Sequence, residues 1–461
     1  MSLPRSPAIP DPREATRFRF LGCDYDAGQG VASLSYAFDN GPELVEQITF
    51  PHAPWPPEAS RQACFRRALE MLWLIAGVSY YKAGLSSQME FEDPRLADGL
   101  ETFLTRLYVE GLAEFGYVNQ VDVAASVRFP PAGSGNPSMQ RERSLLLPER
   151  ALVAMGGGKD SLVGLDLLQQ AGVPVMPVCV GGSDLIRETV EVAGLPLLAI
   201  SRRLAPELSQ MNRSGALNGH VPVTAINSAI LLCASILYGF RYIVFSNERS
   251  ADEATRTTAE GRKINHQYSK SSAFERAFRE VIAQQVSPDI EYFSILRPYS
   301  ELEIVRRFSG MRKFHPVYSS CNRNFHLDGP RVVDRWCLDC PKCRFAALSL
   351  ALYMRPDEVA EIQGGDLLDD ATQEAGFRAL CELGQEKPFE CVGEAGESRA
   401  AMAALGSRSE WRQHAIVRIL LPELEGLVVP QLEDLLRPID EHFIPPSIQA
   451  AVAPLQELVP E

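Results

Sequence analysis

The sequence predicts an α/β protein with a parallel β-sheet at its centre. Between about residues 146 and 351, short apolar runs alternate with helical segments, as they do along a parallel sheet. One of these segments, "TAINSAILLCASILYG" (224–239), is almost wholly apolar, which indicates a helix buried between layers. The composition, 46% hydrophobic and 23% charged, is typical of a soluble globular protein.

The elements of this central region follow one another in order. Residues 151–155 read as a buried strand, and the helix after Asp160 should end at Gly172, a C-terminal cap. A second strand in "VPVMPVCVG", a helix in "DLIRETVEVAG" and a third strand in "LPLLAIS" come next. The apolar helix and a fourth strand in "FRYIVFS" complete the series. We therefore expect one α/β domain over residues 146–351.

Two further regions flank this domain, because 461 residues are too many for one ordinary core. Residues 1–145 mix strand-like alternation, as in "GVASLSYAF", with helical stretches, which predicts an N-terminal α+β domain, a candidate for substrate binding. It ends in the Pro-, Gly- and Ser-rich segment "RFPPAGSGNPSMQRERS", a boundary loop. Residues 352–461 predict a helical C-terminal region with proline breaks.

Charge and hydropathy limit the classes of partner. The formal net charge is −14, whereas nucleic-acid binders usually carry a basic face, so we expect no nucleic-acid partner. Short positive clusters favour a small anionic ligand instead. No apolar run approaches the ~20 residues of a membrane helix, and the N-terminus lacks the apolar core of a secretory signal. We expect a cytoplasmic protein without a membrane partner.

A glycine loop follows the first strand of the central domain. It reads Gly156-Gly157-Gly158-Lys159-Asp160-Ser161 and opens a helix, a position in which backbone N–H groups can cradle phosphate. It is not a Walker loop, because Asp160 follows the lysine. It is not the dinucleotide fingerprint either, because position 161 is not glycine. The alternative is a flexible turn with Asp160 as a helix N-cap.

The loop resembles the Ser-Gly-Gly-x-Asp-Ser motif of the PP-loop ATP pyrophosphatase superfamily, with Gly156 in the place of the serine. This resemblance implies that the loop binds ATP with Mg²⁺ and that the enzyme cleaves ATP between the α- and β-phosphates. It also implies that Asp160 and Ser161 serve ATP and Mg²⁺.

Other polar segments follow the predicted strands, where ligands collect in open α/β sheets. The second strand ends near Gly181, which is a candidate for contact with adenine. The fourth ends at Ser246, Asn247 and Glu248. Beyond it, "NHQYSKS" (265–271) suggests a polar substrate, with a solvated surface loop as the alternative. His220, before the apolar helix, is as often structural as catalytic.

Four cysteines form a candidate metal site. Cys321, Cys337, Cys340 and Cys343 have two overlapping C-x₂-C steps, which suit one tetrahedral zinc ion with a structural role. The segment resembles the zinc knuckle of some PP-loop enzymes. An iron–sulfur cluster and four free thiols are the alternatives.

The whole chain resembles the UDP-N-acetyl-α-D-muramoyl-L-alanyl-L-glutamate epimerases, the MurL family. The resemblance rests on "FRFLGCDYDAGQGVASLSYAFDNGPELVEQITFP", "AMGGGKDS", "SNERSA", "NHQYSKS", the cysteine segment and "KPFECVGE". It implies ATP-dependent inversion of the terminal L-Glu of UDP-MurNAc-L-Ala-L-Glu, with release of AMP and diphosphate, for peptidoglycan synthesis. It also implies a functional link to the UDP-MurNAc-L-Ala:L-Glu ligase that supplies this substrate.

The types of the side chains indicate which residues are candidates for this chemistry. Arg249, Asn265, Tyr268 and Arg323 are candidates for substrate binding, since they offer cations and hydrogen-bond donors to carboxylates and diphosphate. His266, Lys270 and Cys391 are candidates for proton transfer, with Tyr268 as a further one. The alternative functions are another adenylylating PP-loop enzyme, such as a tRNA thiolase, a deazaguanine synthase or an amide-forming synthetase, and a nucleotide-sensing scaffold.

Overall fold

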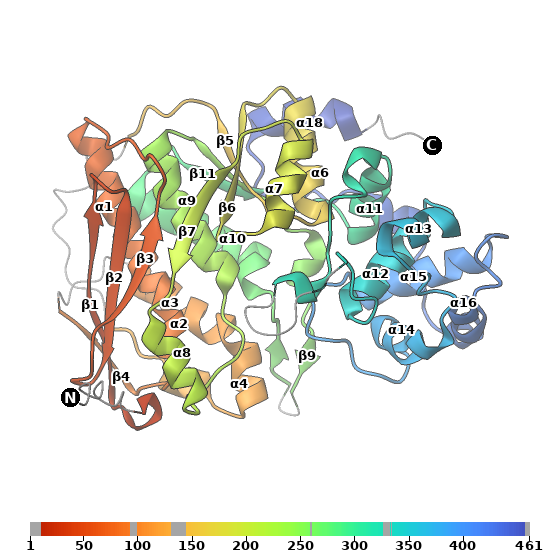
Figure 1. Cartoon of the computed structure of the whole chain (residues 1–461), viewed down its shortest axis with the longest axis horizontal. Coiled ribbons are helices and arrows are strands. Elements are labelled where there is room, and N and C mark those ends of the chain that lie inside the picture. Colours follow the sequence, from red (N-terminus) through yellow and green to blue (C-terminus); the bar gives the residue numbers. More distant parts are fainter. Residues whose placement is uncertain are drawn as a thin grey trace, which may run out of the picture.

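A nine-stranded β-sheet forms the centre of the molecule (Figure 1). The computed structural model describes residues 11–92, 99–130, 144–258, 261–325, 332 and 334–456. The strand order is β11-β8-β5-β6-β7-β3-β2-β1-β4. The strands are β1 (Arg17–Asp26), β2 (Val31–Phe38), β3 (Leu44–Thr49), β4 (Gln88–Phe91), β5 (Ala151–Ala154), β6 (Val175–Val180), β7 (Leu198–Arg203), β8 (Tyr242–Phe245) and β11 (Glu291–Ser294).

Five neighbouring strands, from β11 to β7, pair in parallel. Four of them confirm the strands predicted for the central region, and β11 is an edge strand that the sequence did not reveal. Adjacent residues such as Leu152 and Val153 of β5 are both buried but belong to different apolar clusters. The strands are therefore covered on both faces, which explains why they are short continuous apolar runs.

The N-terminal strands extend the same sheet. β3 pairs antiparallel with β7 through Gln47–Thr49, and β2, β1 and β4 follow it outward. One apolar cluster also spans the two regions, with Phe20 of β1 and Ile230 of the apolar helix among its members. The N-terminal region thus shares both sheet and core with the central region. The boundary loop predicted before residue 146 lies largely outside the described residues.

Helices cover both faces of the sheet. In the first two thirds of the chain they are α1 (Ala59–Ala76), α2 (Val78–Tyr81), α3 (Leu100–Gly111), α4 (Ala113–Asn119), α5 (Val123–Ser126), α6 (Lys159–Gln170), α7 (Asp184–Val192), α8 (Pro206–Arg213), α9 (Val223–Tyr238), α10 (Ser272–Val281) and α11 (Glu301–Ser309). The apolar helix α9 packs against α1 and is buried, as predicted. Helices α6 and α11 belong to the opposite face. Gly172 has a φ of 71° just after α6, which confirms the predicted helix stop.

The C-terminal region is helical, as predicted, and its larger part lies at the end of the molecule opposite to β1–β4 (Figure 1). Its helices, with the one that precedes them, are α12 (Pro341–Leu350), α13 (Pro356–Gln363), α14 (Glu374–Cys381), α15 (Ala395–Gly406), α16 (Ala415–Leu420), α17 (Leu432–Leu436) and α18 (Pro446–Gln456). They share an apolar cluster with α6 and α11. Among the described residues, no helix has the length and apolar character that crossing a membrane requires.

Candidate active site

A polar pocket lies at the carboxyl ends of β5 and β8, the edge at which ligands bind in open α/β sheets. It is built from segments that are far apart in the chain: the glycine loop, the residues after β8, the first turn of α9, the start of α11, the residues before Cys321, α12, and the loop that carries Cys391. Its polar and charged lining residues are Lys159, Asp160, Ser161, Thr224, Asn227, Ser246, Asn247, Glu248, Lys270, Glu301, Ser319, Ser320, Lys342 and Cys391, together with Gly156 and Gly158.

The glycine loop turns directly from β5 into α6. Gly157 has a φ of 75°, the left-handed conformation that glycine adopts at little cost. Gly158 is the N-cap residue of α6. Because glycine has no side chain, it makes no side-chain capping hydrogen bond. The Ser161 hydroxyl accepts from the Gly156 N–H (3.3 Å) and donates to the Gly158 carbonyl (3.0 Å). The loop is therefore held by Ser161 and leads directly into α6, as the sequence predicted.

One glycine outside this loop also shapes the pocket. A Cβ on Gly164 of α6 would lie 2.3 Å from the hydroxyl oxygen of Ser246. Helix α6 can approach the end of β8 only because this position has no side chain. This close packing brings the glycine loop next to the residues that follow β8.

Three carboxylates gather beside the loop. Oxygen atoms of Asp160, Glu248 and Glu301 lie within 4.8 Å of one another. The buried Lys159 ammonium donates to Asp160 (2.5 Å) and to Glu301. Burial lowers the pKa of Lys159, but the two carboxylates outweigh it and raise the pKa above its usual range. Lys159 is therefore a cation that partly neutralises this group of carboxylates.

Glu301 is the most constrained of the three carboxylates. Burial raises its pKa, the Lys159 ammonium lowers it, and the charges of Asp160 and Glu248 raise it again, so that the pKa lies well above the usual range. A second positive charge at this position would relieve the repulsion. The three carboxylates offer the hard oxygen ligands that Mg²⁺ prefers.

Two polar atoms of the pocket are buried without a hydrogen-bond partner in the described part of the chain: Ser246 Oγ and Asn227 Oδ1. Leaving a buried polar atom unpaired costs about 1–3 kcal/mol. Both atoms lie at the pocket wall, and a polar ligand would satisfy them.

A second cluster joins three residues that the sequence nominated for proton transfer; Lys270 and Cys391 line the pocket, and His266 lies behind them. Lys270 Nζ lies 3.1 Å from Cys391 Sγ, and His266 Nε2 lies 4.0 Å from the same sulfur. The Nδ1 atom of His266 is hydrogen-bonded to the Thr255 hydroxyl (2.6 Å). Burial, followed by the charge of Lys270, lowers the pKa of His266 to about 3, so the imidazole is neutral near pH 7.

A buried arginine fixes two of the pocket segments. The Arg297 guanidinium, only 1% exposed, pairs with Glu275 (3.0 Å). It also donates to the carbonyl groups of Glu248 (2.7 Å) and Lys270 (2.5 Å). Arg297 thus holds the backbone of a carboxylate residue and of a lysine residue at a set separation.

The structure brings Gly156, Gly158, Ser246, Asn247 and the neighbouring loop residues together, but other predicted residues lie elsewhere. Gly181 lines a different pocket, with Glu188, Arg335 and Trp336.

Four further nominated residues make structural contacts. The Arg249 guanidinium donates to the carbonyl groups of Leu435 and Arg437, which anchors the end of α17. Asn265 donates to the Ala251 carbonyl. Tyr268 is buried in an apolar cluster, and His220 lies 3.5 Å from Glu114.

Glu301, Lys342, Ser319 and Ser320 are pocket residues that the sequence did not single out. Glu301 is the first residue of α11 after its N-cap, Ser300. Lys342 lies in the first turn of α12, between two of the clustered cysteines in sequence. Lys342 and the serine pair had one signal in the sequence, because they adjoin the predicted cysteines, whereas Glu301 had none.

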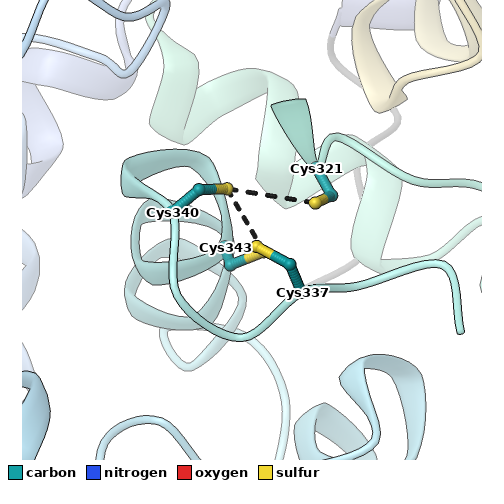
Figure 2. A group of neighbouring side chains, drawn as sticks. All are labelled: Cys321, Cys337, Cys340 and Cys343. Atoms are coloured by element: carbon teal, nitrogen blue, oxygen red, sulfur yellow. Dashed lines mark hydrogen bonds between the residues drawn. The ribbon is translucent and has the colours of Figure 1, made fainter. Parts of the chain in front are cut away.

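The four predicted cysteines converge on one point (Figure 2). Their sulfur atoms lie 3.8 Å apart for Cys337 and Cys343, 3.4 Å for Cys340 and Cys343, and 4.0 Å for Cys321 and Cys340. Four sulfurs around one tetrahedral zinc ion, with bonds of about 2.3 Å, would be roughly 3.8 Å apart. The separations fit a single ion. A four-iron cluster instead binds each cysteine to a different iron atom.

The cysteine cluster is connected to the pocket. The Asn322 side chain, next to Cys321, donates to Glu390, next to Cys391, at 2.5 Å. On the other side of Cys321, the Ser319 N–H donates to the carbonyl of Gly157 in the glycine loop (3.4 Å). Arg323 makes a surface ion pair with Asp339 (2.8 Å). The segment around Cys321 therefore contacts two walls of the pocket.

These features define an α/β protein with a glycine loop and three neighbouring carboxylates at the carboxyl ends of its parallel strands. The chain belongs to the MurL family: residues 10–295 match the MurL N-terminal domain and residues 317–434 match the MurL C-terminal domain.

Relatives match almost the whole chain. A protein of Xanthomonas oryzae pv. oryzae named UDP-N-acetyl-alpha-D-muramoyl-L-alanyl-L-glutamate epimerase is 45% identical over 95% of this chain and 97% of its own. A Micromonospora protein of the same name is 39% identical over 96% and 98%. A tRNA-5-methyluridine(54) 2-sulfurtransferase of Thermus thermophilus is 30% identical, but over only 28% of this chain and 39% of its own.

Proposed function

We propose that the protein is an ATP-dependent epimerase that inverts the terminal L-Glu of UDP-MurNAc-L-Ala-L-Glu and releases AMP and diphosphate. The observation that carries the proposal is that one pocket contains the glycine loop, the three carboxylates and the Lys270–Cys391 pair. Activation of a carboxylate and proton transfer at the neighbouring carbon need these groups side by side. The names of relatives that span nearly the whole chain support the substrate.

ATP is the first substrate, bound as in the PP-loop superfamily. The N-terminus of α6 and the glycine loop offer backbone N–H groups and a positive dipole to the phosphates. Ser246 Oγ and Asn227 Oδ1, which are buried and unpaired, offer hydrogen bonds to the nucleotide. Both observations fit a polar, anionic ligand in this pocket.

Asp160, Glu248 and Glu301 would hold Mg²⁺. Their oxygen atoms are close enough to share one ion, and their mutual repulsion is only partly relieved by Lys159. When bound, Mg²⁺ would neutralise negative charge on the phosphates of ATP. The residues themselves place this charge next to the first turn of α6.

The proposed reaction starts at the α-carboxylate of the terminal L-Glu. One carboxylate oxygen attacks the α-phosphorus of ATP; the new O–P bond forms as the bond to the pyrophosphate oxygen breaks, and pyrophosphate leaves. The acyl group no longer carries a negative charge, so loss of the α-proton no longer creates two adjacent charges. After the proton has been exchanged, water attacks the acyl carbon, AMP leaves, and the carboxylate is restored in the D-form.

The cysteine cluster would hold zinc in a closed, structural site. All four ligands come from the protein, which leaves no open position for a substrate. Its proposed role is to fix the segment around Cys321 against the glycine loop and the Cys391 loop.

We further propose that the protein acts in the cytoplasm in peptidoglycan synthesis, after the ligase that makes UDP-MurNAc-L-Ala-L-Glu. Binding of the substrate by Arg249, Asn265, Tyr268 and Arg323 stays a prediction. Lys270 and Lys342 are the cations that the structure places in the pocket beside Lys159.

The test is to incubate the pure protein with ATP, Mg²⁺ and UDP-MurNAc-L-Ala-L-Glu and to measure AMP, pyrophosphate and the chirality of glutamate after acid hydrolysis. We expect D-Glu and AMP together, and neither in Asp160→Ala. Pyrophosphate without inversion would retain ATP cleavage and exclude the epimerase, as expected of another adenylylating enzyme. Absence of both products would exclude the proposal.

A further inference from the structure

Cys391 has surroundings that differ from those of an ordinary buried thiol. It is half-buried at the wall of the pocket, in the loop between α14 and α15. Its sulfur atom is within hydrogen-bonding distance of an ammonium group, Lys270 Nζ at 3.1 Å, and 4.0 Å from His266 Nε2.

The charges around this sulfur favour a negative atom. Burial lowers the pKa of Lys270, but negative charge at Cys391 and then at Glu248 outweighs it, so the net shift is upward and Lys270 is a cation. The charged or titratable groups that act on the neighbouring His266 are Lys270, His220, Lys387 and Lys342. Because His266 is neutral, it does not protonate the sulfur near pH 7.

We propose that the Cys391 thiolate is the group that exchanges a proton with the α-carbon of the activated glutamate, and that Lys270 is the positioning residue that holds its charge. This inference rests on the proposed epimerase function and names the proton-transfer residue of the same pocket. An ammonium group at hydrogen-bonding distance stabilises a thiolate, and a thiolate can accept a proton from carbon.

The step conserves atoms and electrons. The sulfur takes the proton from the α-carbon, an S–H bond forms, the C–H bond breaks, and its electron pair moves to the acyl oxygen as an enolate. Inversion is completed when a proton from a second donor of the pocket reaches the opposite face of the carbon. In the reverse direction Cys391 is the donor, so either role requires the same side chain.

The test separates proton transfer from activation. Wild type, Cys391→Ala and Cys391→Ser are incubated with ATP, Mg²⁺ and UDP-MurNAc-L-Ala-L-Glu in D₂O, and AMP, D-Glu and α-deuterium are measured. We expect the variants to lose inversion by at least about 100-fold. They should still form AMP and pyrophosphate, because water can hydrolyse the activated L-Glu. Cys23→Ser is the control: burial raises the pKa of Cys23 to about 12, and it lies on β1 outside the pocket, so this variant should match wild type.

Each outcome decides the point. Inversion and deuterium incorporation retained in Cys391→Ala would overturn the proposal for Cys391 while leaving the epimerase intact. An acyl adduct on Cys391 in the intact-mass spectrum of the wild type during turnover would also overturn it, since the sulfur would then act as a nucleophile. If wild type itself forms no AMP, the proposed function fails instead.

The role of Lys270 is tested by the reactivity of Cys391, which a merely structural role of Lys270 would not change. We compare the rate of alkylation of Cys391 by iodoacetamide at pH 7 in wild type, Lys270→Met and Lys270→Arg. Loss of the cation in Lys270→Met should slow alkylation by about 10-fold or more, because only the thiolate reacts, and Lys270→Arg should restore most of the rate. Equal rates in all three proteins would overturn the role of Lys270.

Discussion

The pocket and the cysteine cluster are both groups of possible metal ligands, but they are built in opposite ways. The pocket combines three carboxylates, a buried lysine and unpaired polar atoms. The cluster consists of four thiols, and three pairs of their sulfur atoms lie 3.4–4.0 Å apart. The first arrangement is incomplete without a ligand, and the second is complete with a single ion.

The ligand chemistry differs as well. Carboxylate oxygens suit Mg²⁺, which keeps open positions for water and phosphate, whereas four thiolates suit zinc and close its coordination. This difference supports our proposal that the reaction takes place in the pocket and that the cysteine cluster has a structural role.

The largest effect is expected from Asp160→Asn. The change removes one carboxylate charge beside the glycine loop but keeps the shape of the side chain. We expect AMP formation and inversion to fall by roughly 1,000-fold, with zinc content unchanged. Activity is measured by AMP release and metal by mass spectrometry. Loss of zinc in this variant would show that the two regions are not separate.

A smaller loss is expected from Cys340→Ser, which removes a thiol whose sulfur lies 3.4 Å from that of Cys343. Zinc content should fall from about one per chain to near zero, and the melting temperature should fall with it. Activity should fall by about 10–100-fold, because the segment around Cys321 no longer supports the pocket walls. Cys381→Ser, a buried thiol outside the cluster, is the control for zinc content. Full activity without bound metal would contradict the supporting role.

The third prediction concerns the proton-transfer side of the pocket and its response to pH. The pKa of His266 is lowered to about 3 by burial, so between about pH 3 and 6.5 the unfolded chain binds a proton that the folded chain does not. The free energy of unfolding should therefore decrease as pH falls below 6.5, by about 2 kcal/mol from this group between pH 7 and pH 5. Urea titrations of wild type and His266→Asn at both pH values measure the difference. An equal decrease in the two proteins would show that His266 is not held neutral.

The smallest effect is expected from Asn322→Ala, which removes one of the two hydrogen bonds described between the two regions. Loss of this bond to Glu390 should cost about 1 kcal/mol in the positioning of the Cys391 loop, or roughly a 5-fold decrease in kcat. Zinc content and KM for ATP should not change. Steady-state kinetics decide the point, and a loss as large as that of Cys340→Ser would mean that this one bond carries the whole effect of the cluster.

The two regions also differ in how well the sequence predicted them. Three of the four cysteines lie within seven residues, from Cys337 to Cys343, and the C-x₂-C spacing has few other meanings, so all four cluster residues were predicted. The glycine loop was predicted for the same reason, because its motif is local. The four central strands and the apolar helix followed from hydrophobic runs of the proper length.

Glu301 had no local signal in the sequence. It reaches the pocket because β11 adds to the sheet edge beside β8 and the chain then turns into α11, and this pairing depends on tertiary contacts. Nothing in the sequence distinguishes Arg297 from other arginines. Its role depends on its burial and on its bonds to Glu275, Glu248 and Lys270. Arg249, in contrast, had the right charge near the right strand, but its side chain points to the end of α17.

The sequence also did not predict how many strands belong to the same sheet. Residues 44–49 show the alternation of a strand, but nothing in them indicates the partner β7, which lies about 150 residues later. The N-terminal region is therefore continuous with the central sheet, although its composition suggested a unit of its own.

We propose that ATP activates the α-carboxylate of the substrate in this pocket. The most direct measurement uses UDP-MurNAc-L-Ala-L-Glu labelled with ¹⁸O in that carboxylate and analyses the AMP by mass spectrometry. We expect AMP to carry ¹⁸O, because the labelled oxygen bonds to the α-phosphorus and stays there when water attacks the acyl carbon. D-Glu formed together with unlabelled AMP would contradict the account.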